Sequence, residues 1–125
     1  MAKEFEFVQE ILKEVAKNGR SLGYTAYAVK GYDTFGYIVT PNDNVIGVTK
    51  DYFGGVNFDL EYVPSSAHGS GCRCNDAPLF SFDVADLAAL ESKGLAFAKQ
   101  LGAKLYHGSG AWLSRCYWLH ALKEL

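Results

Sequence analysis

Four stretches rich in β-branched and aromatic residues follow one another in the first half of the chain, with no helical pattern between them. They are Tyr24–Tyr32, Phe35–Thr40, Val45–Lys50 and Val56–Val63. The short segments that separate them contain Gly, Pro, Asn and Asp, which are the residues of tight turns. Because short turns join antiparallel neighbours and parallel strands need long crossovers, the order predicts a four-stranded antiparallel meander.

The fourth stretch alternates strictly between apolar and polar residues. Its apolar residues are Val56, Phe58, Leu60 and Tyr62, and its polar residues are Asn57, Asp59 and Glu61. Successive side chains of a strand point to opposite faces of the sheet. The alternation therefore predicts a sheet with one buried face and one solvent-exposed face.

Helical periodicity precedes and follows the meander. It predicts a first helix over Lys3–Asn18, ended by Gly19, and a second over Asp83–Leu101, with Asp83 as N-cap and Gly102 at its end. The apolar stripe of the second helix is expected to be Leu87, Leu90, Gly94, Phe97 and Leu101.

A short extended piece is expected at Lys104–Tyr106, and a third helix begins with Ser109 as its cap. The helices are expected to cover one face of the sheet. The predicted fold is a single α+β domain, residues 1–125, with the order α-β-β-β-β-α-α: a four-stranded meander with an N-terminal helix and two C-terminal helices.

Composition narrows the classes of function. The 125 residues carry a net charge of −2, the pI is near 5.9, and the twelve Lys and Arg are scattered. A nucleic-acid or membrane binder normally shows a basic stripe, so neither partner is expected. The N-terminus has no signal-peptide pattern, and no apolar run approaches the ~20 residues of a membrane span. Three cysteines form no secreted disulfide framework, so a cytoplasmic protein with reduced thiols is expected.

The segment Pro64–Pro78 between the last strand and the second helix is the first place to look for a site. It holds one histidine, two cysteines, an arginine and two glycines, and it is longer than the ~2–6 residues that such connections usually need. One hypothesis is zinc, the only cofactor considered, held by His68, Cys72 and Cys74 with a fourth ligand from His107, Cys116 or His120. A lone Cys-x-Cys is a weak metal signal, and ordinary loop cysteines are the simpler interpretation.

The same segment supports two other hypotheses. Gly69, Ser70 and Gly71 could form a nest of backbone N–H groups beside Arg73, which would bind an anion or a nucleotide. Alternatively, a thiolate at Cys72 or Cys74 could act as a nucleophile. No nucleophile elbow or other catalytic motif accompanies these cysteines, so we do not expect an enzyme and predict no catalytic residue.

Carboxylates and tyrosines supply a further candidate surface. Asp59 and Glu61 share one face of their strand about 7 Å apart and could do acid–base work or bind a divalent metal, although a polar strand face is the ordinary interpretation. The chain has eight tyrosines, more than one small core needs, and exposed tyrosine is typical of interfaces. A protein interface is therefore expected, and self-association through an edge strand is one form of it.

One resemblance bears on the partner. Glu61-Tyr-Val-Pro-Ser65, Gly69-Ser-Gly-Cys-Arg-Cys74 and Tyr117-Trp118 resemble features of small uncharacterised proteins carried by bacteriophages and mobile elements. That resemblance implies an accessory protein that blocks a host defence system, as anti-CRISPR proteins do without a cofactor. It implies no catalytic residue.

The functional prediction is a non-enzymatic module that binds and inhibits a host defence protein in the bacterial cytoplasm. Its expected contact residues are Asp59, Glu61, Tyr62, His68 and Arg73. The alternative is a small-ligand or zinc-binding module that uses the Gly69–Cys74 segment.

Overall fold

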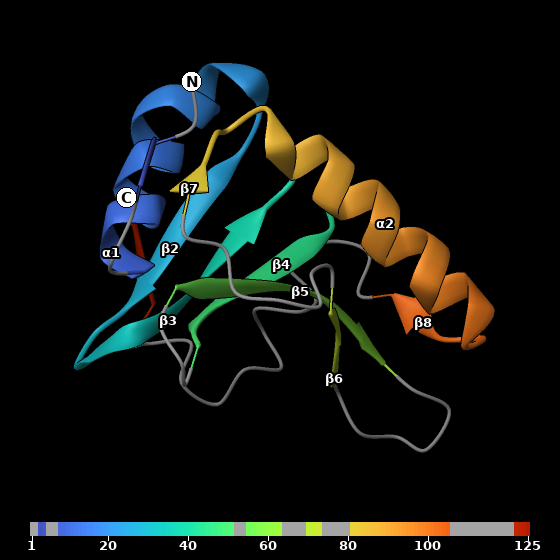
Figure 1. The fold of residues 1–125 in the computed structure, drawn as a ribbon. Helices are drawn as coiled ribbons and strands as arrows, with labels where there is room; N and C mark the ends of the chain where they lie inside the picture. Colours follow the sequence, from blue (N-terminus) through green and yellow to red (C-terminus); the bar gives the residue numbers. More distant parts are fainter. Residues whose placement is uncertain (1–2, 5–7, 52–54, 64–69, 74–80, 106–121) are drawn as a thin grey trace.

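The computed structural model describes residues 3–4, 8–51, 55–63, 70–73, 81–105 and 122–125 (Figure 1). The strands are β1 (Lys3–Glu4), β2 (Thr25–Val29), β3 (Tyr32–Val39), β4 (Val45–Lys50), β5 (Val56–Val63), β6 (Ser70–Arg73), β7 (Ser81–Phe82), β8 (Lys104–Leu105) and β9 (Leu122–Glu124). The helices are α1 (Val8–Glu14), which continues as a π-helical turn η1 (Val15–Gly19) and a 3₁₀ turn η2 (Arg20–Leu22), and α2 (Asp86–Gln100).

The main sheet has the strand order β6-β5-β4-β3-β2-β9, and all of its pairs are antiparallel. Strands β2 to β5 form the predicted meander, which is confirmed. The sheet is wider than predicted because β6 adds to one side and β9 to the other. A separate two-stranded sheet joins β1 and β7.

Strand β8 extends the sheet beside the end of β5. Tyr62 pairs with Ser70 of β6 and also with Leu105 of β8. A strand residue has two neighbours, so β8 lies on the side of β5 that β4 occupies further along. Figure 1 shows β8 where the chain turns back at the end of α2.

The two helices cover the same face of the sheet and enclose the main core. The core's largest fully buried side chains are Ile11 and Leu12 of α1, Leu87 of α2, and Ile38, Ile46, Phe58 and Leu60 of the sheet. Phe82 of β7 stacks on Phe58 with ring centroids 5.2 Å apart, which ties the small sheet to the same core. The α+β class and the placing of the helices on one face are confirmed.

The first helix differs from its predicted limits. Lys3 and Glu4 lie in β1, and the helical path extends to Leu22 instead of stopping at Gly19. Gly19 has a right-handed φ of −95°, and an added Cβ would lie within 3.3 Å of side chains of Val15, Tyr24 and Val84. Gly19 therefore allows the close packing of these side chains. The helical path is ended by Gly23, which has a left-handed conformation with φ 94°.

The buried stripe of α2 also differs from the prediction. Leu87 and Gly94 are buried as expected, but Phe97 is 44% exposed and Leu101 is 54% exposed. Glu91 and Ala98 are buried in their place. The helix is thus rotated away from the orientation that apolarity alone predicts.

Three smaller predictions have clear outcomes. Asp83 makes the contacts of an N-terminal cap in the turn that leads into α2: its carboxylate accepts a hydrogen bond from Ala85 N (3.2 Å), and Asp83 N donates to the Asp86 carboxylate (3.1 Å). Gly102, with φ 65°, follows the end of α2, and the extended piece at Lys104 is β8, both as predicted. The third helix, expected from Ser109, lies outside the described residues.

The second face of the sheet is not simply solvent-exposed, which corrects the prediction from β5. Val29, Tyr37, Val39 and Val45 form a second buried apolar cluster. Tyr27, Phe35 and Leu122 pack against its edges. Apolar side chains of β2 to β4 on this face are therefore buried as well.

Gly36 of β3 sets the distance between α1 and the sheet. An added Cβ would collide with the end of the Leu12 side chain and lie 2.8 Å from the backbone oxygen of Tyr27. Gly36→Ala should lower the free energy of unfolding by about 1–3 kcal/mol, because the backbone oxygen cannot move aside cheaply. Urea denaturation measures this, with Thr34→Ala, exposed on the same strand, as the control. Equal stability of the two variants would show that α1 does not pack this closely.

Candidate functional site

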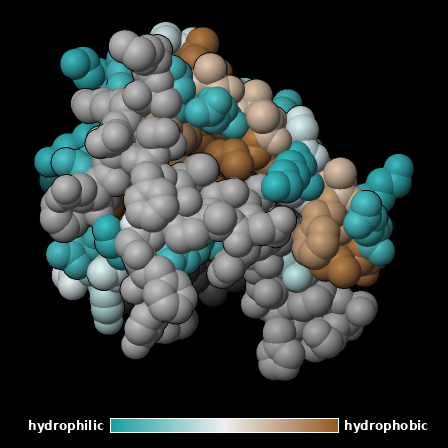
Figure 2. All heavy atoms as spheres, viewed as in Figure 1, coloured by the Kyte–Doolittle hydropathy of each residue, from teal (hydrophilic) through white to brown (hydrophobic). Residues whose placement is uncertain are grey.

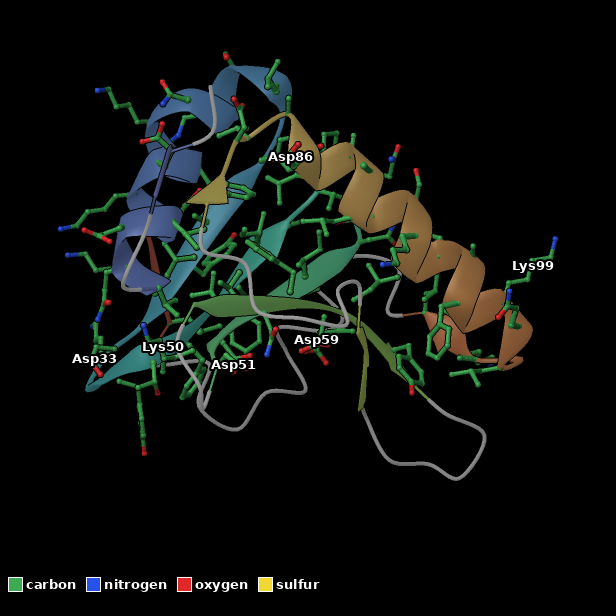
Figure 3. All side chains as sticks on the ribbon, in the orientation of Figure 1. Asp33, Lys50, Asp51, Asp59, Asp86 and Lys99 are labelled. Atoms are coloured by element: carbon green, nitrogen blue, oxygen red, sulfur yellow. The ribbon has the colours of Figure 1, made fainter. Side chains whose placement is uncertain are left out.

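One row of residues crosses the main sheet from edge to edge. Successive register pairs join Glu124 to Tyr27, Tyr27 to Tyr37, Tyr37 to Gly47, Gly47 to Asp59, and Asp59 to Arg73. The row lies on the face opposite the helices, since its β5 member alternates with the core residues Phe58 and Leu60. Figure 3 shows Asp59 on that side, turned away from α2.

Gly47 makes room in this row for the side chain of Glu61. An added Cβ at Gly47 would lie 2.8 Å from Glu61 Oε1, so the carboxyl group rests where a larger residue would stand. Burial, and then the negative charge of Asp59, raise the pKa of Glu61 from 4.5 to about 7. A carboxyl group with this pKa can take up or release a proton near neutral pH.

The other half of the face is aromatic. The rings of Tyr32 and Phe35 lie 5.2 Å apart, and those of Phe35 and Tyr37 lie 6.3 Å apart in an edge-to-face arrangement. Burial, and then the charge of Glu124, raise the pKa of Tyr27, which keeps this phenol protonated. The face therefore divides into an aromatic half on β2 and β3 and an acidic half on β5, with Gly47 between them.

A further polar contact lies at the start of β5, on the acidic half of the face. Asn57, almost fully buried, donates a hydrogen bond of 2.5 Å from Nδ2 to Asp51 Oδ2. Its Oδ1 atom has no hydrogen-bond partner among the described residues. The contact closes the connection between β4 and β5, where Asp51 N also donates to Gly55 O (3.1 Å).

A second polar cluster lies on the helix side of the sheet, around Glu91 of α2. Glu91 is only 4% exposed, and its carboxylate accepts hydrogen bonds from Thr40 Oγ1, Asn42 Nδ2 (3.0 Å) and Asn44 Nδ2 (2.9 Å). All three donors belong to the turn between β3 and β4. Three donors compensate for the cost of burying one carboxylate.

The Glu91 cluster also fixes the conformation of that turn. Thr40 N donates to Asn44 O (2.8 Å), and Asn44 N donates back to Thr40 Oγ1 (3.1 Å). Asp43 takes a left-handed conformation, with φ 64°. The cluster joins α2 to the sheet and has a structural role. The cluster was not predicted from the sequence, although Glu91, an acidic residue three before Gly94 in an apolar helix face, is a signal for it.

The five expected contact residues do not share one surface. Asp59 and Glu61 are half-buried on the acidic half, whereas Tyr62 lies on the opposite face of β5 and packs against the helix-covered core. Arg73 occupies the register position opposite Asp59. His68 lies outside the described residues.

The Pro64–Pro78 segment contains a strand where a loop was expected. Ser70–Arg73 form β6, with Leu60 opposite Cys72. A strand points successive N–H groups to opposite sides, whereas an anion-binding nest needs them to converge, so this backbone argues against the nest. Of the zinc set, His68 and Cys74 lie outside the described residues.

Metal-ligand clusters and membrane-spanning helices are both lacking in the described residues. No group of three His, Cys, Asp or Glu side chains that could hold a metal ion occurs among them. None of the helices in the described part of the chain is both long and apolar enough to cross a bilayer.

An exposed apolar patch occupies the C-terminal end of α2. Phe97 and Leu101 lie four residues apart and so fall on the same flank of the helix, in line with the half-buried Leu90 two turns before Phe97. Figure 2 shows apolar side chains gathered over this end of α2, bordered by hydrophilic ones. We call Phe97 and Leu101 the α2 patch.

Comparison with known proteins gives no relative: no family model, no curated protein and no solved structure matches this chain. The candidate sites are therefore distinguished by their own chemistry. The sheet face opposite the helices offers a titrating carboxyl group, Glu61; the Glu91 cluster offers rigidity; and the α2 patch offers exposed apolar area.

Glu91→Gln tests the structural role of the Glu91 cluster. The substitution keeps the shape of the side chain but turns an NH₂ group toward hydrogen-bond donors, so the free energy of unfolding should fall by about 1–3 kcal/mol. Lys93→Gln, two residues along and exposed, is the control and should have little effect. Urea denaturation that gives the same midpoint for both variants would refute the role assigned to Glu91.

Glu61→Gln tests the raised pKa. The folded protein holds this proton up to about pH 7, whereas the unfolded chain loses it near pH 4.5. The stability that Glu61 contributes is therefore full below about pH 4.5 and is lost as the pH rises to about 7. Glu61→Gln should remove this decline, and Asp33→Asn, an exposed carboxyl, should keep it. The free energy of unfolding is measured by urea denaturation at several pH values between 4.5 and about 7. If it falls with pH equally in wild type and Glu61→Gln, the raised pKa of Glu61 is contradicted.

Proposed function

We propose that the protein is a non-enzymatic binding module that recognises another protein through the α2 patch. The observation that carries the proposal is the exposure of two large apolar side chains, Phe97 and Leu101, side by side on one helix flank. When a partner covers adjacent exposed apolar side chains, the hydrophobic free energy of binding is favourable, and no polar group of those side chains has to be desolvated. A cluster of such side chains is typical of interfaces.

The orientation of α2 on the sheet supports a binding role for the α2 patch. Glu91 takes the buried position that a more apolar helix would give to a leucine, and Phe97 is left outside. Burying Phe97 in the core would have gained hydrophobic free energy on folding. That free energy remains available for binding.

The acidic half of the opposite face is a weaker candidate for the functional surface. Gly47, against which the Glu61 carboxyl group rests, and Tyr37, the register partner of Gly47 on β3, are both buried. The described residues at this point therefore offer no exposed apolar surface on which a substrate could lie. This favours binding over acid–base catalysis as the function.

The partner class follows from the resemblance to phage and mobile-element proteins. We propose a host defence protein in the bacterial cytoplasm, inhibited when this chain covers its functional surface. Such inhibition needs neither a cofactor nor a catalytic residue.

Affinity capture from lysate of a bacterial host tests the proposal. The bait is the full chain, compared with Phe97→Asp and Leu101→Asp; each change should abolish capture of the specific partner, because a buried carboxylate would have to be desolvated at the interface. The control is Leu22→Asp, since Leu22 is equally exposed (56%) but lies on η2, after α1. Circular dichroism checks that the variants fold.

Three results would count against the α2 patch. They are capture unaffected by either α2 substitution, capture lost only in Leu22→Asp, and no protein held specifically by the wild type. In the first two cases the binding surface lies elsewhere. In the third the chain is not a binding module for that proteome.

A further inference from the structure

We infer that the site at the end of α2 takes an extended, acidic segment of its partner, added as a strand to β6 beneath the α2 patch. The inference rests on the proposed function and specifies how binding occurs. It combines three observations: a sheet edge that is unpaired among the described residues, the flank of α2 that carries the patch, and the charge around the patch.

The first observation is the edge itself. Strand β6 pairs with β5 on one side, and among the described residues no strand pairs with its other side. An unpaired edge offers a row of N–H and C=O groups that another extended chain can bind. The pairing with β5 runs from Ser70 to Arg73. Alternate residues of a four-residue strand direct their N–H and C=O groups away from the paired strand, so the outer edge of β6 presents both hydrogen-bond donors and acceptors.

The second observation is the flank of α2 that carries the patch. Glu91 reaches the turn between β3 and β4, which places that flank of α2 toward the middle of the sheet. At 3.6 residues per turn, Phe97 lies about 120° around the axis from Glu91. Phe97 therefore lies on a flank of α2 away from the turn between β3 and β4, and α2 contacts both β5 and β6, the two strands at the other end of the order β6-β5-β4-β3.

The third observation is charge. The exposed charged residues of the described chain from the middle of α2 to β8 are Lys93, Lys99 and Lys104, all positive, although the whole chain has a net charge of −2. Asp86 lies at the other end of α2 from Lys99 (Figure 3). A partner that covers the apolar side chains would therefore gain from carrying Asp or Glu at its rim.

The opposite edge of the sheet lacks these features. Strand β9 carries the exposed, charged Lys123 and Glu124, and charged side chains of this kind protect an edge from pairing. Beside β9, where Arg20 of η2 donates a hydrogen bond to Leu125 O, the described residues of η2 expose one large apolar side chain, Leu22, and not an apolar pair. Of the two edges, β6 is the one suited to strand addition.

Random peptides displayed on phage provide the probe. They are selected on the immobilised full chain, and peptides that also bind the double variant Phe97→Asp/Leu101→Asp are discarded. Selected peptides should alternate apolar and acidic residues, because alternate side chains of an added strand face the α2 patch and the solvent. A synthetic copy should bind wild type and Leu22→Asp at least about tenfold more tightly than the double variant.

Two measurements on the selected peptide test the mode of binding. N-methylation of alternate peptide amides on the side that pairs should abolish binding, since it removes the donors of the ladder. Hydrogen exchange of the amides of residues 70–73 should slow when the peptide is bound. Both results together would establish strand addition to β6.

Other outcomes separate this inference from the proposed function. If binding requires Phe97 but survives every N-methylation pattern, or if helical or basic peptides are selected, the α2 patch binds a partner and strand addition is wrong. If the chain self-associates at rising concentration, and this depends on Phe97 and slows hydrogen exchange of the β6 amides, then a second copy of the chain binds at β6. The proposal of an acidic partner segment is then wrong. If no peptide distinguishes wild type from the double variant, the inference and the proposed surface both fail.

Discussion

The buried carboxylate of Glu91 determines how α2 lies on the sheet, and much of the molecule's surface follows from that. Its three donors all come from the turn between β3 and β4, so the helix can satisfy the carboxylate only at one rotation about its axis. At that rotation Leu87, Gly94 and Ala98 are buried with Glu91 and Phe97 is left exposed, while Leu101 is exposed just after the last residue of α2. The polar cluster inside the fold thus accounts for the exposure of Phe97 outside it.

The two faces of the sheet show different solutions to burial. The helix-covered face is a conventional apolar core, closed by Phe82 stacked on Phe58. The other face combines an apolar cluster around Tyr37 with half-buried acids on β5, and it tolerates Glu61 because Gly47 leaves space for the carboxyl group. Desolvation and the neighbouring Asp59 then hold a proton on Glu61 up to about pH 7, so this face carries a pH-dependent charge within the fold.

The meander, its antiparallel order and the alternation of β5 could be predicted, because turn residues and period-two patterns are local signals. The short strands β6 and β9 could not, since four or three residues carry too little pattern and their pairing depends on distant partners. The rotation of α2 was not predicted for a related reason. The helical pattern ranks Phe97 above Glu91 for burial, and only the tertiary position of Asn42 and Asn44 reverses that order.

At the candidate site, Asp59 and Glu61 were correctly predicted to share one face of β5. The alternation of β5 also places Tyr62 on the other face, but Tyr62 was predicted as a contact residue together with them. The α2 patch was not predicted, because the exposure of Phe97 depends on the burial of Glu91, and that burial depends on the distant donors Thr40, Asn42 and Asn44.

Site-specific photo-crosslinking tests the central claim most directly. A photoreactive amino acid is placed at position 97, at position 101 or, as the control, at position 22, and each full-length protein is irradiated in bacterial lysate. The account predicts one partner crosslinked from positions 97 and 101 and none from position 22, with the crosslinked peptide of the partner acidic and extended. A partner crosslinked only from position 22, or none from any position while the native chain still captures it, would contradict the claim that α2 presents the binding surface.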